Sequence, residues 1–130
     1  MRAFIKPKLW LGIWLFGWLL CVVLSVITPP NISIDVENSD KIGHFLAYGA
    51  LSAWAVMIFQ DKRSWWKSAI ALICLGIIME FAQGYFTSNR MMDWHDAVAN
   101  AMGVGLGLFV SILPMQVWLQ RIDQKLFQSL

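Results

Sequence analysis

The sequence contains few charged residues. Asp, Glu, Lys and Arg make up 14% of its 130 residues, whereas roughly a quarter of an average soluble domain is charged. Hydrophobic residues make up 58%, and the mean hydropathy is +0.60. The formal net charge of +2 is too small to indicate a nucleic-acid partner. This composition excludes an ordinary soluble domain and predicts a protein whose partner is the lipid bilayer.

The sequence also lacks the usual signatures of metal and catalytic sites. Its two cysteines, Cys21 and Cys74, lie in apolar runs without a C-x-x-C or Cys/His spacing, so a structural zinc site is not expected. We interpret both as reduced residues with a packing role. There is no G-x-S-x-G, P-loop or H-E-x-x-H motif, and the familiar serine hydrolases, P-loop NTPases and zinc proteases therefore have no support.

Long apolar runs dominate the chain instead. A helix needs about 20 mainly apolar residues to cross the hydrocarbon core, and four segments approach this length: residues 9–28, 43–59, 68–85 and 97–118. Residues 60–67 are expected to form a basic loop. The sequence therefore predicts an all-α fold, a single domain of residues 1–130 built as an integral membrane bundle of four transmembrane helices. Trp10, Trp14 and Trp18 share a face of the first helix and predict a stripe of packing or interfacial aromatics.

A short amphipathic tail follows the fourth predicted span. Its apolar face contains Leu119, Ile122, Leu126 and Leu130. Its polar face contains Gln120, Arg121, Asp123, Gln124 and Lys125. A helix with this pattern is expected to lie on the membrane surface rather than to bind a partner.

Basic residues gather on one side of the predicted bundle. Eight of the ten Lys and Arg lie near the N-terminus, in the loop of residues 60–67 or in the tail, and only Lys41 and Arg90 lie on the other side. The positive-inside rule then predicts a multi-pass protein with both termini in the cytoplasm.

Three predicted helices carry polar residues at their outer ends, and at 1.5 Å of rise per residue His44, Glu80 and Asn100 are expected roughly 5–10 Å below the outer interface. We call this set the polar layer; it contains Asp40, Lys41, His44, Tyr48, Glu80, Gln83, Arg90, Asp93, Asp96 and Asn100. An ionisable group at membrane depth costs roughly 2.5–3.5 kcal/mol on insertion scales and is a functional hypothesis by default. We therefore expect a ligand-binding site, although helix capping is an alternative role for Asp40 and Asp93.

The fourth helix also carries a stripe of closely spaced small and polar residues. Asp93, Asp96, Asn100, Gly103 and Gly107 follow one another at intervals of three or four, which places them on one face. The two glycines predict close packing against another helix in preference to the approach of a ligand.

The polar layer resembles the pattern of the VanZ-like family. The resemblance covers about residues 40–107 and rests on Asp40-Lys41-x-x-His44-Phe45-x-x-Tyr48, Glu80-x-x-Gln83 and Arg90-x-x-Asp93-x-x-Asp96-x-x-x-Asn100-x-x-Gly103, with Gly107. It implies a small integral protein of the bacterial cell envelope, and hence of the inner membrane. The founding member of the family is associated with resistance to the glycopeptide antibiotic teicoplanin. The resemblance implies no particular reaction or ligand, and His95 is not part of the pattern.

Three functions remain open. The one we favour is binding of an envelope molecule, either a lipid head group or a lipid-linked wall precursor. The second is a membrane-embedded hydrolase or transferase with His44, Glu80 and Asp96 as candidate catalytic residues; a divalent metal held by carboxylates is an option without direct support. The third is a salt-bridged structural subunit that binds a membrane-protein partner.

Overall fold

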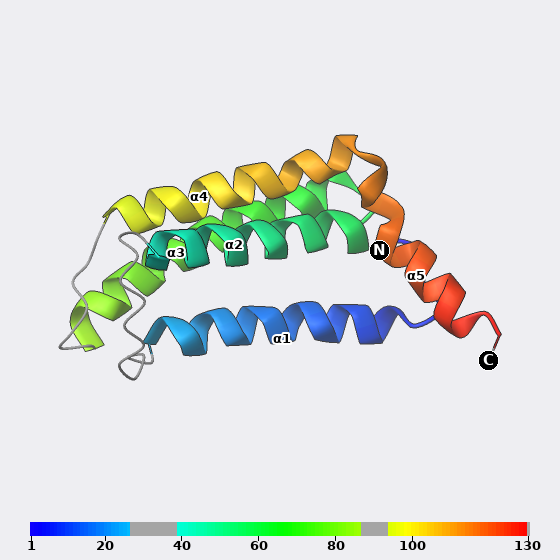
Figure 1. Cartoon of the computed structure of the whole chain (residues 1–130), viewed down its shortest axis with the longest axis horizontal. Coiled ribbons are helices and arrows are strands. Elements are labelled where there is room, and N and C mark those ends of the chain that lie inside the picture. Colours follow the sequence, from blue (N-terminus) through cyan, green and yellow to red (C-terminus); the bar gives the residue numbers. More distant parts are fainter. Residues whose placement is uncertain (27–38, 87–93, 130) are drawn as a thin grey trace.

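The computed structural model describes residues 1–26, 39–86 and 94–129. In these residues the fold is all-α, as predicted, and contains no strand. Four long helices run side by side, as Figure 1 shows: α1 (Pro7–Val26), α2 (Ser39–Ile58), α3 (Lys62–Phe86) and α4 (Trp94–Leu108). Two 3₁₀ turns, η1 (Phe109–Ile112) and η2 (Pro114–Val117), connect α4 to the short α5 (Trp118–Phe127).

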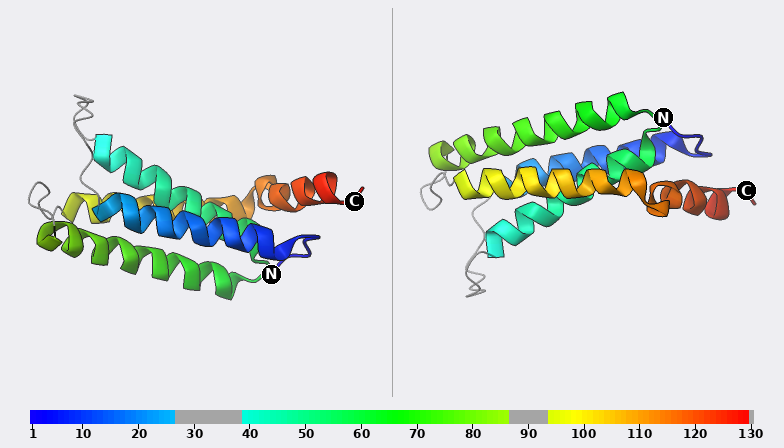
Figure 2. Two further views of the ribbon diagram at one scale, coloured as in Figure 1. Left: turned by 90° about the horizontal axis from the view of Figure 1, so that it is seen from below. Right: turned by 90° about the horizontal axis from the view of Figure 1, so that it is seen from above.

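The central element is α2. It packs against α1, α3 and α4 and also touches both 3₁₀ turns and α5. Figure 2 shows that α2 crosses α4 obliquely and that α2 and α3 diverge toward the end at which α2 begins. The other three long helices are therefore arranged around α2.

In the described part of the chain, three helices are long and apolar enough to cross a membrane: Pro7–Leu24 in α1, Lys62–Ala82 in α3, and Trp94–Ile112 in α4 with η1. The apolar part of α2, Ile42–Ile58, falls short because its first turn is polar. These helices give the chain the character of a membrane protein. The fourth span remains a prediction.

The segment of residues 60–67 was expected to be a loop, but α3 already begins at Lys62. The carboxylate of Asp61 accepts hydrogen bonds from the backbone N–H of Ser64 at 2.9 Å and from its hydroxyl. An aspartate in this position satisfies a free N–H group of the first turn, which starts the helix early.

The predicted fourth helix, residues 97–118, is also interrupted. Helix α4 ends at Leu108, and Leu113 is extended, with φ −104° and ψ 154°. Pro114 explains the break, because the proline ring pushes the residue before it out of the helical region. The tail helix α5 can therefore take a direction different from that of α4, as Figure 1 shows.

Both termini lie at one end of the bundle, together with the connection between α2 and α3 (Figure 1). We call this the terminal end. The eight basic residues that the sequence grouped together all lie in segments at this end: Arg2, Lys6, Lys8, Lys62, Arg63, Lys67, Arg121 and Lys125. The grouping is as predicted, whereas the side of the membrane that this end faces remains a prediction.

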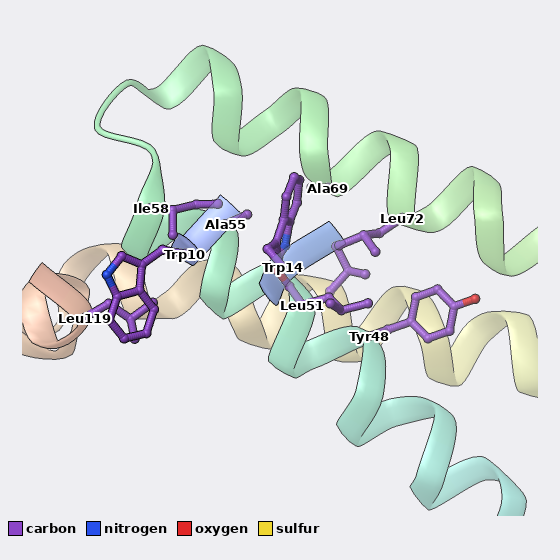
Figure 3. Close-up of a cluster of buried hydrophobic side chains, with 10 residues drawn as sticks. Trp10, Trp14, Tyr48, Leu51, Ala55, Ile58, Ala69, Leu72 and Leu119 are labelled. Atoms are coloured by element: carbon purple, nitrogen blue, oxygen red, sulfur yellow. The ribbon is translucent and has the colours of Figure 1, made fainter. Parts of the chain in front are cut away.

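The apolar core lies toward the terminal end, where Trp10 and Trp14 of α1 pack with residues of α2, α3, α4 and α5 (Figure 3). The indole N–H of Trp14 donates a hydrogen bond to the carbonyl oxygen of Leu51 at 3.0 Å. Both tryptophans are buried, and Trp18 packs against the cluster. The tryptophan stripe is thus a packing feature, one of the two roles expected.

Asp123 corrects the prediction for the tail, which placed it on the exposed polar face; it is instead fully buried. Its carboxylate accepts hydrogen bonds from the backbone N–H of Ile5, from that of Lys6 at 3.1 Å, and from the indole of Trp10 at 2.8 Å. We call these three bonds the N-terminal latch. Burial acts to raise the pKa of Asp123, but the three hydrogen bonds and the charge of Lys6 outweigh it and lower the pKa below its ordinary value of 3.8.

Candidate functional site

Glycines bring the backbones of α2 and α4 into contact. A methyl group added at Gly107 would lie 2.5 Å from the carbonyl oxygen of Gly49 and 2.8 Å from the backbone nitrogen of Ala53. One added at Gly103 would overlap the carbonyl oxygen of Phe45. Only glycine fits at both positions, so the predicted packing role of Gly103 and Gly107 is confirmed.

A buried hydrogen bond joins the same two helices. The hydroxyl of Ser52 donates to the carbonyl oxygen of Val104 at 2.8 Å, and both residues are buried. Such a bond across a helix pair is possible only where small residues allow the backbones to come close. The α2–α4 pair therefore holds the side chains on its borders in a fixed register.

A second close contact joins α3 and α4. A methyl group added at Gly76 would lie 3.0 Å from the amide nitrogen of Asn100 and 3.2 Å from its Cβ. The side chain of Asn100 thus rests on the backbone of α3, one turn before Glu80. The contact positions the amide of α4 beside the carboxylate-bearing face of α3.

These contacts gather buried polar side chains from three helices. Tyr48 of α2, Glu80 of α3 and Asn100 of α4 are each only 1% exposed, and we call them the buried polar trio. Tyr48 lies close enough to Glu80 to interact with it electrostatically, and also to Cys21 of α1. Figure 3 shows Tyr48 at the edge of the apolar cluster. Tyr48 therefore borders the core on the side away from the terminal end.

Within the described residues, three atoms of the trio have no hydrogen-bond partner. They are the hydroxyl oxygen of Tyr48 and both the nitrogen and the oxygen of the Asn100 amide. A buried polar group without a partner costs roughly 1–3 kcal/mol, and lipid offers no replacement. A tyrosine hydroxyl and an asparagine amide can each donate and accept hydrogen bonds. This arrangement can hold a guest that has both donors and acceptors, such as a hydroxyl or an amide.

His44 and Asp96 extend the site toward the far end of the bundle. The ring of His44 stacks on that of Tyr48, with ring centres 6.5 Å apart and planes 12° apart. Asp96 lies in the first turn of α4, where the helix dipole favours a negative charge. Both side chains are half-buried. They can contact a ligand that also reaches the trio.

The structure thus places five members of the polar layer: His44, Tyr48, Glu80, Asp96 and Asn100. Asp40 and Lys41 lie in the first turn of α2 and Gln83 near the end of α3, but their side chains are outside the described part of the structure. Arg90 and Asp93 lie outside the described residues altogether. The role of the layer as a binding site remains a prediction.

Two contributors to this region were missed in the sequence. Gly76 is an isolated glycine in an apolar helix, a signal of close backbone approach that could have been used. Cys21 was interpreted as a packing residue; it packs against the core and also lies near Tyr48. The packing interpretation of Cys74 is wrong, because this free cysteine is exposed on the bundle.

No metal site emerges from the described parts of the chain, where no group of three or more His, Cys, Asp and Glu side chains could hold an ion. Asp93, one of the carboxylates considered for such a site, is outside these parts.

Comparison with known proteins gives one result. A family model described as VanZ/LLP1 matches residues 18–115, which is most of the chain. The matched segment includes α2, α3 and α4 with the whole buried polar trio. No curated protein and no solved structure matches the chain.

Proposed function

Because the chain belongs to the VanZ-like family, we propose that it is a bacterial membrane protein whose polar layer binds a cell-envelope molecule. The ligand is a lipid head group or a lipid-linked wall precursor, held between α2, α3 and α4. The protein sits in the inner membrane with the terminal end, and so both termini, in the cytoplasm. The polar layer then faces the outer side, where such molecules are exposed.

The observation that carries this proposal is the set of unpartnered atoms on Tyr48 and Asn100. In a purely structural clasp, the polar side chains of three helices would satisfy one another. Here two of the three have hydrogen-bonding capacity left over within the described residues. A ligand with hydroxyl, amide or amine groups supplies the missing partners and offsets the cost of burying them.

The proposal is tested by native mass spectrometry of the gently extracted protein beside its Tyr48→Phe variant. Tyr85→Phe is the matched control, because Tyr85 is 84% exposed. The parent and the control should carry a discrete bound mass. The affinity of the Tyr48→Phe variant for the ligand should fall about tenfold, which corresponds to the loss of one buried hydrogen bond, and its bound mass should fall accordingly. A parent without any enriched lipid, or a Tyr48→Phe variant with full occupancy, contradicts the proposal.

A membrane-embedded hydrolase or transferase is the second candidate. The stacking of His44 on Tyr48, which itself interacts with Glu80, favours it. A histidine titrates near neutral pH and can move a proton next to a buried carboxylate. Incubation of the purified protein with the lipid found by mass spectrometry decides between the two: an altered lipid mass that disappears in His44→Gln indicates an enzyme, and an unaltered mass indicates a binding protein.

The resistance associated with the founding member gives a cellular test. If the bound molecule is a wall precursor, expression of this chain in a sensitive bacterium should raise the teicoplanin concentration needed to stop growth. The Tyr48→Phe variant should lose the effect and Tyr85→Phe should keep it. Equal sensitivity of all strains contradicts a role in glycopeptide resistance but leaves the lipid-binding test intact.

A further inference from the structure

Helix α5 presents an exposed face that combines apolar and basic side chains. Trp118, Ile122 and Leu126 lie one turn apart and are 50%, 44% and 55% exposed, and Arg121 and Lys125 are exposed beside them. We call these five residues the α5 surface. We propose that the α5 surface docks onto anionic lipid head groups of the leaflet at the terminal end.

The N-terminal latch sets the depth of α5. Asp123, in the middle of α5, accepts hydrogen bonds from the backbone N–H groups of Ile5 and Lys6, and the apolar stretch of α1 begins at the next residue, Pro7. The middle of α5 is therefore level with the start of a membrane span. This level is the interface, where an amphipathic helix places its apolar side chains among the acyl chains.

The latch also sets the charge of the surface. Asp123 is the one acidic residue of α5, and its burial leaves Arg121 and Lys125 as the charges that α5 exposes. Among the other acidic side chains that the structure describes, Asp61 is the one at the terminal end, and it accepts hydrogen bonds from Ser64. The exposed charge is thus almost entirely positive, which complements an anionic leaflet and gives about fivefold in affinity per basic residue.

The structure revises the surface that the sequence pattern predicted. The pattern assigned the apolar face to Leu119, Ile122, Leu126 and Leu130, but Leu119 is buried in the core and Leu130 lies outside the described residues. The turn at Pro114 and the latch orient α5 so that Leu119 and Asp123 face the bundle, and Trp118 joins Ile122 and Leu126 on the exposed apolar side.

The test uses the full chain in nanodiscs, with Cys21→Ala and Cys74→Ala introduced so that a spin label can be placed at Ile122→Cys. Gln124→Cys, on the polar side of α5, is the control site. In discs that contain phosphatidylglycerol, the label at position 122 should be accessible to oxygen and shielded from a water-soluble nickel chelate, and the label at 124 should show the reverse. In pure phosphatidylcholine, the shielding at position 122 should weaken.

Arg121→Gln with Lys125→Gln separates the lipid from other occupants of this surface. The double variant should lower the ratio of docked to undocked label about 25-fold in anionic discs, the product of two fivefold effects. Equal chelate accessibility at position 122 in both lipids overturns the proposal. The proposal is also overturned if the shielding of the label at position 122 does not depend on phosphatidylglycerol but increases with the number of chains per disc, because a second copy of the chain then covers the surface.

Discussion

The amide of Asn100 on α4 rests against the backbone of α3 at Gly76, so that a methyl group at Gly76 would lie 3.0 Å from the amide nitrogen. This contact limits where the unpartnered amide can point, because the backbone of α3 at Gly76 lies against it. The position of the Asn100 amide thus depends on the absence of a side chain at Gly76 of the neighbouring helix.

Gly76→Ala should therefore disturb the site more than the fold. The added methyl group must displace Asn100 by a few tenths of an ångström, and we expect a loss of about 1–2 kcal/mol in the free energy of unfolding with a several-fold loss of bound lipid. Gly12→Ala is the control, since nothing lies within 4 Å of a methyl group there. Thermal unfolding and native mass spectrometry measure both effects; an equal response of the two variants would show that the Gly76–Asn100 contact has no special role.

The α2–α4 contact should tolerate no side chain. Gly107→Ala forces a methyl group into the backbone of α2, with the carbonyl oxygen of Gly49 at 2.5 Å, and should cost about 3 kcal/mol or prevent folding. Gly105→Ala, two residues earlier, points into open space and should raise helix stability by up to about 1 kcal/mol. Unfolding in detergent distinguishes the two variants, and a Gly107→Ala protein as stable as the Gly105→Ala protein would contradict the close contact between α2 and α4.

Removal of the charge of Asp123 should release the N-terminus. In Asp123→Asn the backbone N–H groups of Ile5 and Lys6 and the indole of Trp10 lose a charged acceptor, and we expect a loss of about 2 kcal/mol, typical of a hydrogen bond to a charged group. Hydrogen exchange of residues 1–10 should accelerate. Asp61→Asn is the control, because Asp61 is exposed and its side-chain hydrogen bonds go to Ser64 of the same helix turn; acceleration of the same segment to the same extent in Asp61→Asn would rule out a specific latch.

The latch should also depend on pH in one direction. The pKa of Asp123 is lowered in the folded protein, because its hydrogen bonds and Lys6 outweigh burial. A carboxylate whose pKa is lowered in the folded protein stabilises the folded state at pH values above its ordinary pKa of 3.8. This stabilisation is lost as the pH falls through the pKa of the folded state. A spin label at Ala3→Cys should therefore stay immobile between pH 8 and pH 5 and become mobile only below about 3.8. Release near neutral pH would mean that another group holds the segment.

The sequence was sufficient for features that depend on local pattern. Apolar runs located the four long helices, and the spacing of Gly103 and Gly107 predicted a close helix contact. The boundaries at Lys62 and Leu108 were missed because Asp61 caps α3 and because Pro114 acts through the conformation of Leu113. Asp123 could not be assigned from pattern, because its partners lie more than a hundred residues away and only the folded chain brings them together.

The sequence pointed to the members of the buried polar trio but not to their geometry. The order of helix ends places polar residues in one layer, which pointed to Tyr48, Glu80 and Asn100. The sequence could not show that the hydroxyl and the amide lack partners among the described residues, because this depends on rotamers and on the α3 backbone at Gly76. The proposal of a ligand rests on that geometry.

The most direct test of ligand binding by the polar layer is a paired measurement on Asn100→Leu, which keeps the branching of the side chain and removes its polar atoms. The melting temperature is measured on delipidated protein, and the bound mass on gently extracted protein. Ser52→Ala, which loses the hydrogen bond to Val104 in the same helix pair, is the control and should be destabilised by about 1 kcal/mol while keeping its lipid. If the polar layer binds a ligand, Asn100→Leu should melt at the same or a higher temperature than the parent, because the unpartnered amide is gone, and should carry no bound lipid. An Asn100→Leu protein that melts well below the parent and retains the bound mass would contradict the account and identify the layer as a structural clasp.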